Sequence, residues 1–76
     1  MTTMDPVQLD STSLAAAAHD RHRHLLQLQF CDGSVYHYFG VTDQTYHELL
    51  TADSKGAYFN RCIRGRYPYA ASPLTQ

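Results

Sequence analysis

Tyrosine and basic side chains are the residues of this 76-residue chain whose spacing could support binding chemistry. Tyr36 and Tyr38 are two positions apart, so both rings would point to the same face of a sheet if they lie in a strand. Aromatic rings at such positions can stack on nucleic-acid bases, and arginine binds phosphate through a planar set of donors. The candidate nucleic-acid-binding residues are therefore Tyr36, Tyr38, Lys55, Arg61, Arg64 and Arg66. The alternative is that the two tyrosines lie under a helix, because a domain this small needs its aromatic side chains for packing.

The charges are distributed unevenly along the chain. Residues 1–53 contain seven acids and two arginines, a net charge of −5, whereas residues 54–76 contain four cations and no acid, a net charge of +4. This asymmetry indicates a basic patch near the C-terminus. Neutralisation of the acidic part within the folded domain explains the distribution equally well, because the total net charge is only −1.

Metal binding and catalysis have little support in the sequence. Five histidines are scattered over residues 19–47, and His22 and His24 are the only pair spaced to share one strand face, with no Cys-x-x-Cys element to complete a zinc site. A cysteine nucleophile needs a neighbouring base, and no such base can be placed beside Cys31 or Cys62. We therefore expect a non-catalytic chain without metal or cofactor.

Protein recognition is the alternative to nucleic-acid binding. Tyr67 and Tyr69 flank Pro68 near the C-terminus, and tyrosine is enriched among the residues that dominate interface energetics. Exposed, these rings would bind a protein partner or a second copy of the chain. The same segment could equally fold back on the sheet and bury Tyr67.

Size and composition indicate the number of domains and the cellular location to expect. A chain of this length supports one small domain, and its two cysteines cannot form a disulfide framework. The first residues do not read as a secretory signal, and no apolar run approaches the ~18 residues that a membrane span requires. We expect a cytoplasmic protein that does not enter a membrane, with a flexible N-terminus over residues 1–10, a domain over residues 11–69 and a flexible tail over residues 70–76.

A β-hairpin is the clearest local prediction. Asp32-Gly33 separates two runs, residues 24–31 and 34–39, that largely alternate between apolar and polar side chains. A two-residue loop would pair Gln29 with Tyr36 and Gln27 with Tyr38. The core face would then carry Leu26, Leu28, Phe30, Val35 and Phe39, with His37 among them, and both tyrosines would lie on the other face. A three-residue loop with a bulge would shift this pairing.

The remaining elements are one further strand and two short helices. The Ala-rich segment of residues 14–19 is too short to nucleate a helix alone, and we predict an edge strand there. Thr42 is a suitable N-cap for a helix over residues 41–50, and Ser54 for a second helix over residues 55–64. The predicted fold is α+β, a small antiparallel three-stranded sheet followed by two short helices in the order β-β-β-α-α.

The sequence resembles a known small domain along most of its length. The segment Asp32-Gly33-Ser34-Val35-Tyr36-His37-Tyr38, with Ala52-Asp53-Ser54-Lys55-Gly56-Ala57-Tyr58-Phe59-Asn60 and Ile63-Arg64-Gly65-Arg66-Tyr67, is similar to the KTSC domain. The resemblance extends from about Ser11 to Tyr69. The chain departs from the family pattern at Ala18-His19-Asp20, where Gly-Tyr-Asp is frequent, and at Val41-Thr42, where Val-Pro is usual.

The resemblance implies a fold more directly than it implies a function. KTSC domains occur at the C-terminus of some lysyl-tRNA synthetases and as free-standing bacterial and phage proteins. This setting implies RNA, with tRNA as the particular case, as the ligand of the Tyr36-His37-Tyr38 strand and the basic second helix. At about −0.7 per phosphate contact, four such contacts would give a slope of about −2.8 for log affinity against log salt.

Overall fold

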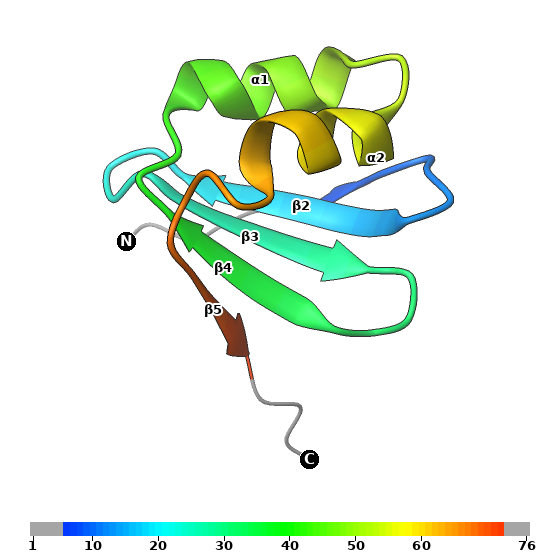
Figure 1. The fold of residues 1–76 in the computed structure, drawn as a ribbon, viewed down its shortest axis with the longest axis horizontal. Helices are drawn as coiled ribbons and strands as arrows, with labels where there is room; N and C mark the ends of the chain where they lie inside the picture. The colour runs from blue at the N-terminus through cyan, green and yellow to red at the C-terminus, as the bar shows by residue number, and fades with distance from the viewer. Residues whose placement is uncertain (1–5, 73–76) are drawn as a thin grey trace.

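The computed structural model describes residues 6–72, which form one antiparallel sheet with helices packed on one of its faces (Figure 1). The elements in chain order are β1 (Val7–Gln8), β2 (Leu14–Asp20), β3 (Leu25–Phe30), β4 (Val35–Phe39), α1 (Asp43–Thr51), α2 (Lys55–Tyr58), the π-helical turn η1 (Phe59–Ile63) and β5 (Tyr69–Ser72).

The sheet has five strands, so the predicted three-stranded sheet is wrong, although the α+β class holds. The strands follow one another across the sheet in chain order, and every neighbouring pair is antiparallel. The predicted chain order is also wrong, because β5 follows the helices and returns to pair with β4. The sequence signals for the two additional strands are weak: β1 has only two residues, and β5 consists mainly of small side chains.

The Ala-rich segment forms β2, between β1 and β3 rather than at an edge. Ala16, Ala17 and Ala18 are at most 5% exposed. Ala17 faces the helices, and its carbonyl accepts a hydrogen bond of 3.5 Å from the hydroxyl of Tyr46 in α1. Small side chains here let a helix with a large aromatic residue pack closely on the sheet.

The hairpin between β3 and β4 has a three-residue loop, the alternative left open by the sequence, so the pairing derived from a two-residue loop is wrong. The amide of Gly33 donates to the carbonyl of Phe30 at 2.9 Å, and the amide of Phe30 donates to the carbonyl of Ser34 at 2.8 Å. Gly33 has φ +94°, whereas Asp32 does not have the positive φ that a type I′ turn would require. The loop is therefore a type I turn followed by a glycine bulge, and Leu28 pairs with Tyr36 and Leu26 with Tyr38.

This shift of one residue exchanges the two faces of β4 relative to the prediction. Tyr36 and Tyr38 lie on the face that carries Leu26 and Leu28, beneath the helices. Val35, His37 and Phe39, which we assigned to the core, lie on the open face. Phe39 is 45% exposed there, and the His37 ring nitrogen Nε2 lies 3.0 Å from Oε1 of Gln27.

Both helices begin at the predicted caps. The hydroxyl of Thr42 accepts a hydrogen bond from the amide of Thr45 at 3.3 Å, and that of Ser54 accepts from the amide of Ala57 at 3.2 Å. The second helix departs from the prediction, because its α-helical part ends at Tyr58 and continues as η1. The core between helices and sheet includes Leu14, Leu26, Leu28, Val41, Leu49 and Ile63, all fully buried.

Two predictions concern the ends of the chain and its relation to membranes. Val7–Gln8 and Tyr69–Ser72 pair within the sheet, partly beyond the predicted domain of residues 11–69, and residues 1–5 and 73–76 lie outside the described part. The flexibility of residues 1–10 and 70–76 remains a prediction. Within residues 6–72, no helix has the length and apolar character needed to cross a bilayer.

Candidate functional site

Tyr36 and Tyr38 differ in their exposure although both face the helices. Tyr38 is only 5% exposed and lies against Phe59 of η1, with ring centroids 5.7 Å apart. Tyr36 is half-buried nearer the β3–β4 loop, and its ring is 6.4 Å from that of Tyr38. The two rings therefore do not form the flat, solvent-exposed stacking surface that the sequence suggested.

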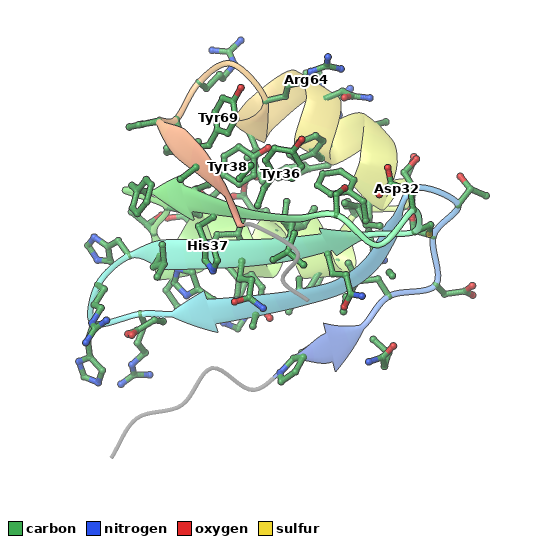
Figure 2. The ribbon with its side chains drawn as sticks, turned by 90° about the horizontal axis from the view of Figure 1, so that it is seen from below. Asp32, Tyr36, His37, Tyr38, Arg64 and Tyr69 are labelled. Carbon is green, nitrogen blue, oxygen red and sulfur yellow. The ribbon has the colours of Figure 1, made fainter. Side chains whose placement is uncertain are left out.

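Tyr69 of β5 completes a group of neighbouring aromatic rings. It pairs with Tyr38 across the strands, and its ring lies 5.6 Å from Tyr38 and 5.8 Å from Tyr36 (Figure 2). Its side chain is 60% exposed. Phe30 of β3 packs edge-on against Tyr36 at 5.6 Å. We call Phe30, Tyr36, Tyr38, Phe59 and Tyr69 the aromatic cluster.

The aromatic cluster lines a groove of about 580 Å³ between the β4–β5 side of the sheet and the second helical segment. This volume is within the range of small-ligand sites. Polar groups stand around the rings: Ser13, Asp32, Ser34, Asn60 and Arg64 also line the groove. The groove can therefore enclose a flat apolar ring and offer it both hydrogen-bond donors and acceptors.

The π-helical turn η1 sets the helical wall of the groove. The amide of Arg64 donates to the carbonyl of Phe59 at 2.8 Å, the i→i+5 bond that closes the turn. Arg64 then leaves the helical conformation, with φ −62° and ψ 126°, and lines the groove. Single π-turns within helices are frequent at functional sites. Here the turn places Arg64 on the helical wall of the groove that the tyrosines line (Figure 2).

The four predicted cations are not brought together. Arg64 lines the groove, whereas the ammonium group of Lys55 donates to the carbonyl of Ala52 at 3.2 Å, at the end of α1. Nε of Arg66 donates to the carbonyl of Arg61 at 3.0 Å. In the part of the chain that the structure describes, no ion pair joins any of these cations to a carboxylate. Direct pairing with the described acids therefore does not explain the basic C-terminal third.

Two groups in the groove have displaced pKa values. Burial raises the pKa of the Tyr38 phenol, and the neighbouring Tyr36 and Tyr69 act in the same direction against the opposing charge of Arg64. Hydrogen bonds from the Ser34 hydroxyl and amide lower the pKa of the Asp32 carboxyl. At neutral pH the groove therefore presents neutral Tyr38, ionised Asp32 and the cation of Arg64.

The two tyrosines predicted to bind a protein partner lie in different environments. Tyr67 is half-buried and packs against the hydrophobic core, as in the fold-back alternative. Tyr69 is exposed on an edge strand, but its ring faces the groove rather than a separate surface. The pair therefore does not form one exposed anchor.

Histidine and cysteine side chains remain dispersed. His19 is buried, with Nε2 2.7 Å from the carbonyl oxygen of Val41, and its ring stacks on Tyr46. Cys31 is exposed and Cys62 half-buried, and both are free thiols. Residues 6–72 contain no group of three or more side chains placed to hold a metal ion. The absence of catalysis and of a cofactor remains a prediction.

Sequence reasoning did not identify Phe30, Phe59, Asp32 and Asn60 as groove residues. The alternative hairpin loop could have pointed to one of them, Phe30, because a glycine bulge turns Tyr36 and Tyr38 to the face that carries it. The π-turn has no such signal, since the sequence of residues 55–64 is compatible with a continuous α-helix.

Comparisons with known proteins assign this fold to a family of small domains. The KTSC domain model matches residues 10–67. An uncharacterized protein from Stutzerimonas stutzeri is 33% identical over 64 residues, 84% of this chain and 90% of that protein. A lysine–tRNA ligase from Trichormus variabilis is 46% identical over 44 residues, 58% of this chain but 8% of the ligase. A crystal structure of a KTSC domain protein from Yersinia pestis has a TM-score of 0.88 and 25% identity, covering 93% of this chain and 100% of that one.

Proposed function

Because the chain belongs to the KTSC domain family, we propose that it is a non-catalytic binding domain that takes an unpaired RNA base into the groove. The relatives' names establish no activity for a free-standing domain of this kind. Unpaired tRNA segments are the expected natural ligand, because a similar segment occurs in lysine–tRNA ligases. The expected setting is the reducing cytoplasm, where free Cys31 and Cys62 would stay reduced.

The observation that carries the proposal is the combination of an aromatic cluster with a guanidinium group in one groove. Unpaired bases bind proteins by stacking on aromatic side chains, while arginine contacts the adjacent phosphate. Phe30, Tyr36 and Tyr69 are the members of the cluster that retain exposure, so they would contact the base. Buried Tyr38 would support them from below.

The proposed affinity is low. Stacking contributes about 1–3 kcal/mol for each base, and a groove of this size would hold one or two bases. Two bases at the upper value give about 6 kcal/mol, and ordering costs reduce this contribution, so the dissociation constant should be about 100 μM or higher. An auxiliary contact of this strength suits a domain that is also found joined to an enzyme that binds tRNA.

The test compares Arg64→Gln with Arg21→Gln, a matched loss of one exposed arginine outside the groove. Binding of fluorescently labelled single-stranded RNA is followed by anisotropy at several salt concentrations. Arg64→Gln should weaken binding about fivefold at low salt and make the slope of log affinity against log salt shallower by about 0.7. Equal behaviour of the two variants, or no RNA binding by the unmodified chain at low salt, would reject the proposal.

Protein recognition is the second candidate, supported by one observation. β5 is an edge strand, and it carries the exposed Tyr69 beside unpaired backbone groups. Such an edge can add a strand from a partner or from a second copy of the chain. Sedimentation at increasing protein concentration tests self-association: a dimer that Tyr69→Ala dissociates supports this candidate, and a monomer at all concentrations removes the homodimer.

A further inference from the structure

Asp32 places a carboxylate at one end of the groove. It lies in the β3–β4 loop and lines the groove together with Ser34. Figure 2 shows it beyond Tyr36, at the hairpin end of the aromatic cluster, while Arg64 stands on the helical wall. An anionic group and a cationic group therefore line different parts of one groove.

The hydrogen bonds of the loop fix the orientation of this carboxylate. Oδ1 of Asp32 accepts from the amide of Ser34 at 2.9 Å and from its hydroxyl at 2.6 Å. Both bonds are made to Oδ1, so Oδ2 has no hydrogen-bond partner among residues 6–72. An oriented carboxylate with one free oxygen accepts a hydrogen bond from a ligand without losing the bonds that hold the loop.

The positions of Arg64 and Asp32 favour one orientation of a nucleotide bound in the groove. A carboxylate repels phosphate, so the sugar–phosphate backbone is favoured near Arg64 and disfavoured near Asp32. A base stacked against Tyr36 would then turn its outer edge toward the hairpin end of the groove. That edge meets a hydrogen-bond acceptor that carries a negative charge.

We infer that Asp32 makes the groove selective for a base whose outer edge carries an amino group, and that the groove binds cytosine in preference to uracil. This inference rests on the proposed RNA-binding function. The two pyrimidines have the same ring size and differ at one position, where cytosine has an amino donor and uracil a carbonyl oxygen. Aspartate accepts a hydrogen bond from the cytosine amino group and repels the uracil carbonyl.

The experiment measures binding of labelled oligo(C) and oligo(U) of equal length by anisotropy, at neutral pH and low salt. Asp32 is exposed, so water weakens the discrimination, and the unmodified chain should bind oligo(C) about threefold to tenfold more tightly. Asp32→Asn should abolish or reverse this preference, because Oδ1 stays bound to Ser34 and the free group becomes an amide NH2, which donates to the uracil carbonyl and cannot accept from cytosine. The variant keeps the acceptor for Ser34, and thermal unfolding checks that its stability is retained.

A matched control separates specific recognition from a general charge effect. Asp53→Asn removes one exposed carboxylate outside the groove, and it should leave the preference for oligo(C) unchanged. Equal binding of the two oligonucleotides by the unmodified chain would overturn the inference while leaving RNA binding intact. A preference that survives in Asp32→Asn would also overturn it. Failure to bind either oligonucleotide would instead reject the proposed function.

Discussion

Tyr38 is a structural residue of the aromatic cluster, although it belongs to the Tyr36-His37-Tyr38 segment, one of those that carry the family resemblance. Its ring is 5% exposed and contacts Phe59 and Tyr69 as well as Tyr36. Tyr36 and Tyr69 keep access to solvent at the same groove. Neighbouring tyrosines therefore have different roles. Tyr38 supports the cluster from within the core, whereas Tyr36 and Tyr69 are accessible to a ligand.

Replacing Tyr38 tests this division. Tyr38→Ala removes a large buried side chain and should lower the free energy of unfolding by about 3 kcal/mol or more, a large part of what a domain of this size has. Tyr69→Ala, at a 60% exposed position, should cost less than about 1 kcal/mol. Urea unfolding followed by circular dichroism gives both values. Similar losses in the two variants would show that Tyr38 is not a core residue.

At the element scale, the loop between β3 and β4 determines which side chains reach the groove. Asp32-Gly33 predicts a hairpin, and a hairpin is present, but the same two residues fit a two-residue or a three-residue loop. A two-residue type I′ loop requires a positive φ at Asp32, and Asp32 does not have one. Its carboxylate accepts two hydrogen bonds from Ser34 in the three-residue loop. One residue of register then decides whether Tyr36 faces the helices or the open side.

The contact between α1 and α2 gives a prediction about alkaline pH. The Tyr58 hydroxyl donates to Oε1 of Glu48 at 2.8 Å, and burial, followed by this bond to Glu48, raises the pKa of the phenol far above its ordinary value of about 10. A phenol that is harder to ionise in the folded state stabilises the fold fully below pH ~10, and that contribution is lost as pH rises above this value.

Tyr58→Phe removes this titration and the bond to Glu48. At neutral pH the variant should be less stable by about 0.5–1.5 kcal/mol. Between pH ~9 and ~11 its stability should fall less steeply than that of the unmodified chain, because one fewer proton is released on unfolding. Tyr38 and Tyr46, whose pKa values are also raised by burial, should account for the remaining slope. Parallel pH profiles from urea unfolding would contradict this account of Tyr58.

At the scale of the whole molecule, the sequence predicted most of the elements but not how they form the groove. The caps at Thr42 and Ser54 and the strand over residues 14–19 follow from local chemistry, and the structure has them. β5 could not be predicted in this way, because Ala70 and Ala71 have no strand pattern of their own and pair with β4, from which the helices separate them along the chain. The groove depends on β5 and on the π-turn, so it could not be read from the sequence.

The uneven charge distribution along the sequence also did not identify which cation belongs to the candidate site. Four cations in the last third of the chain suggested one basic surface. The backbone carbonyls of Ala52 and Arg61 bind Lys55 and Arg66, and only Arg64 of the four lines the groove. Net charge along a sequence therefore indicated that cations are present in this region, but not which of them share a site with the aromatic rings.

The most direct test of the account is chemical-shift mapping by NMR, with the isotope-labelled chain titrated with unlabelled oligo(C). If the groove binds an unpaired base, the largest changes should fall on the amides of Ser34, Tyr36, Asn60, Arg64 and Tyr69, with little change in the loop of residues 21–24 at the other end of β3. Changes centred on that loop or on β1, with the groove amides unmoved, would contradict the account.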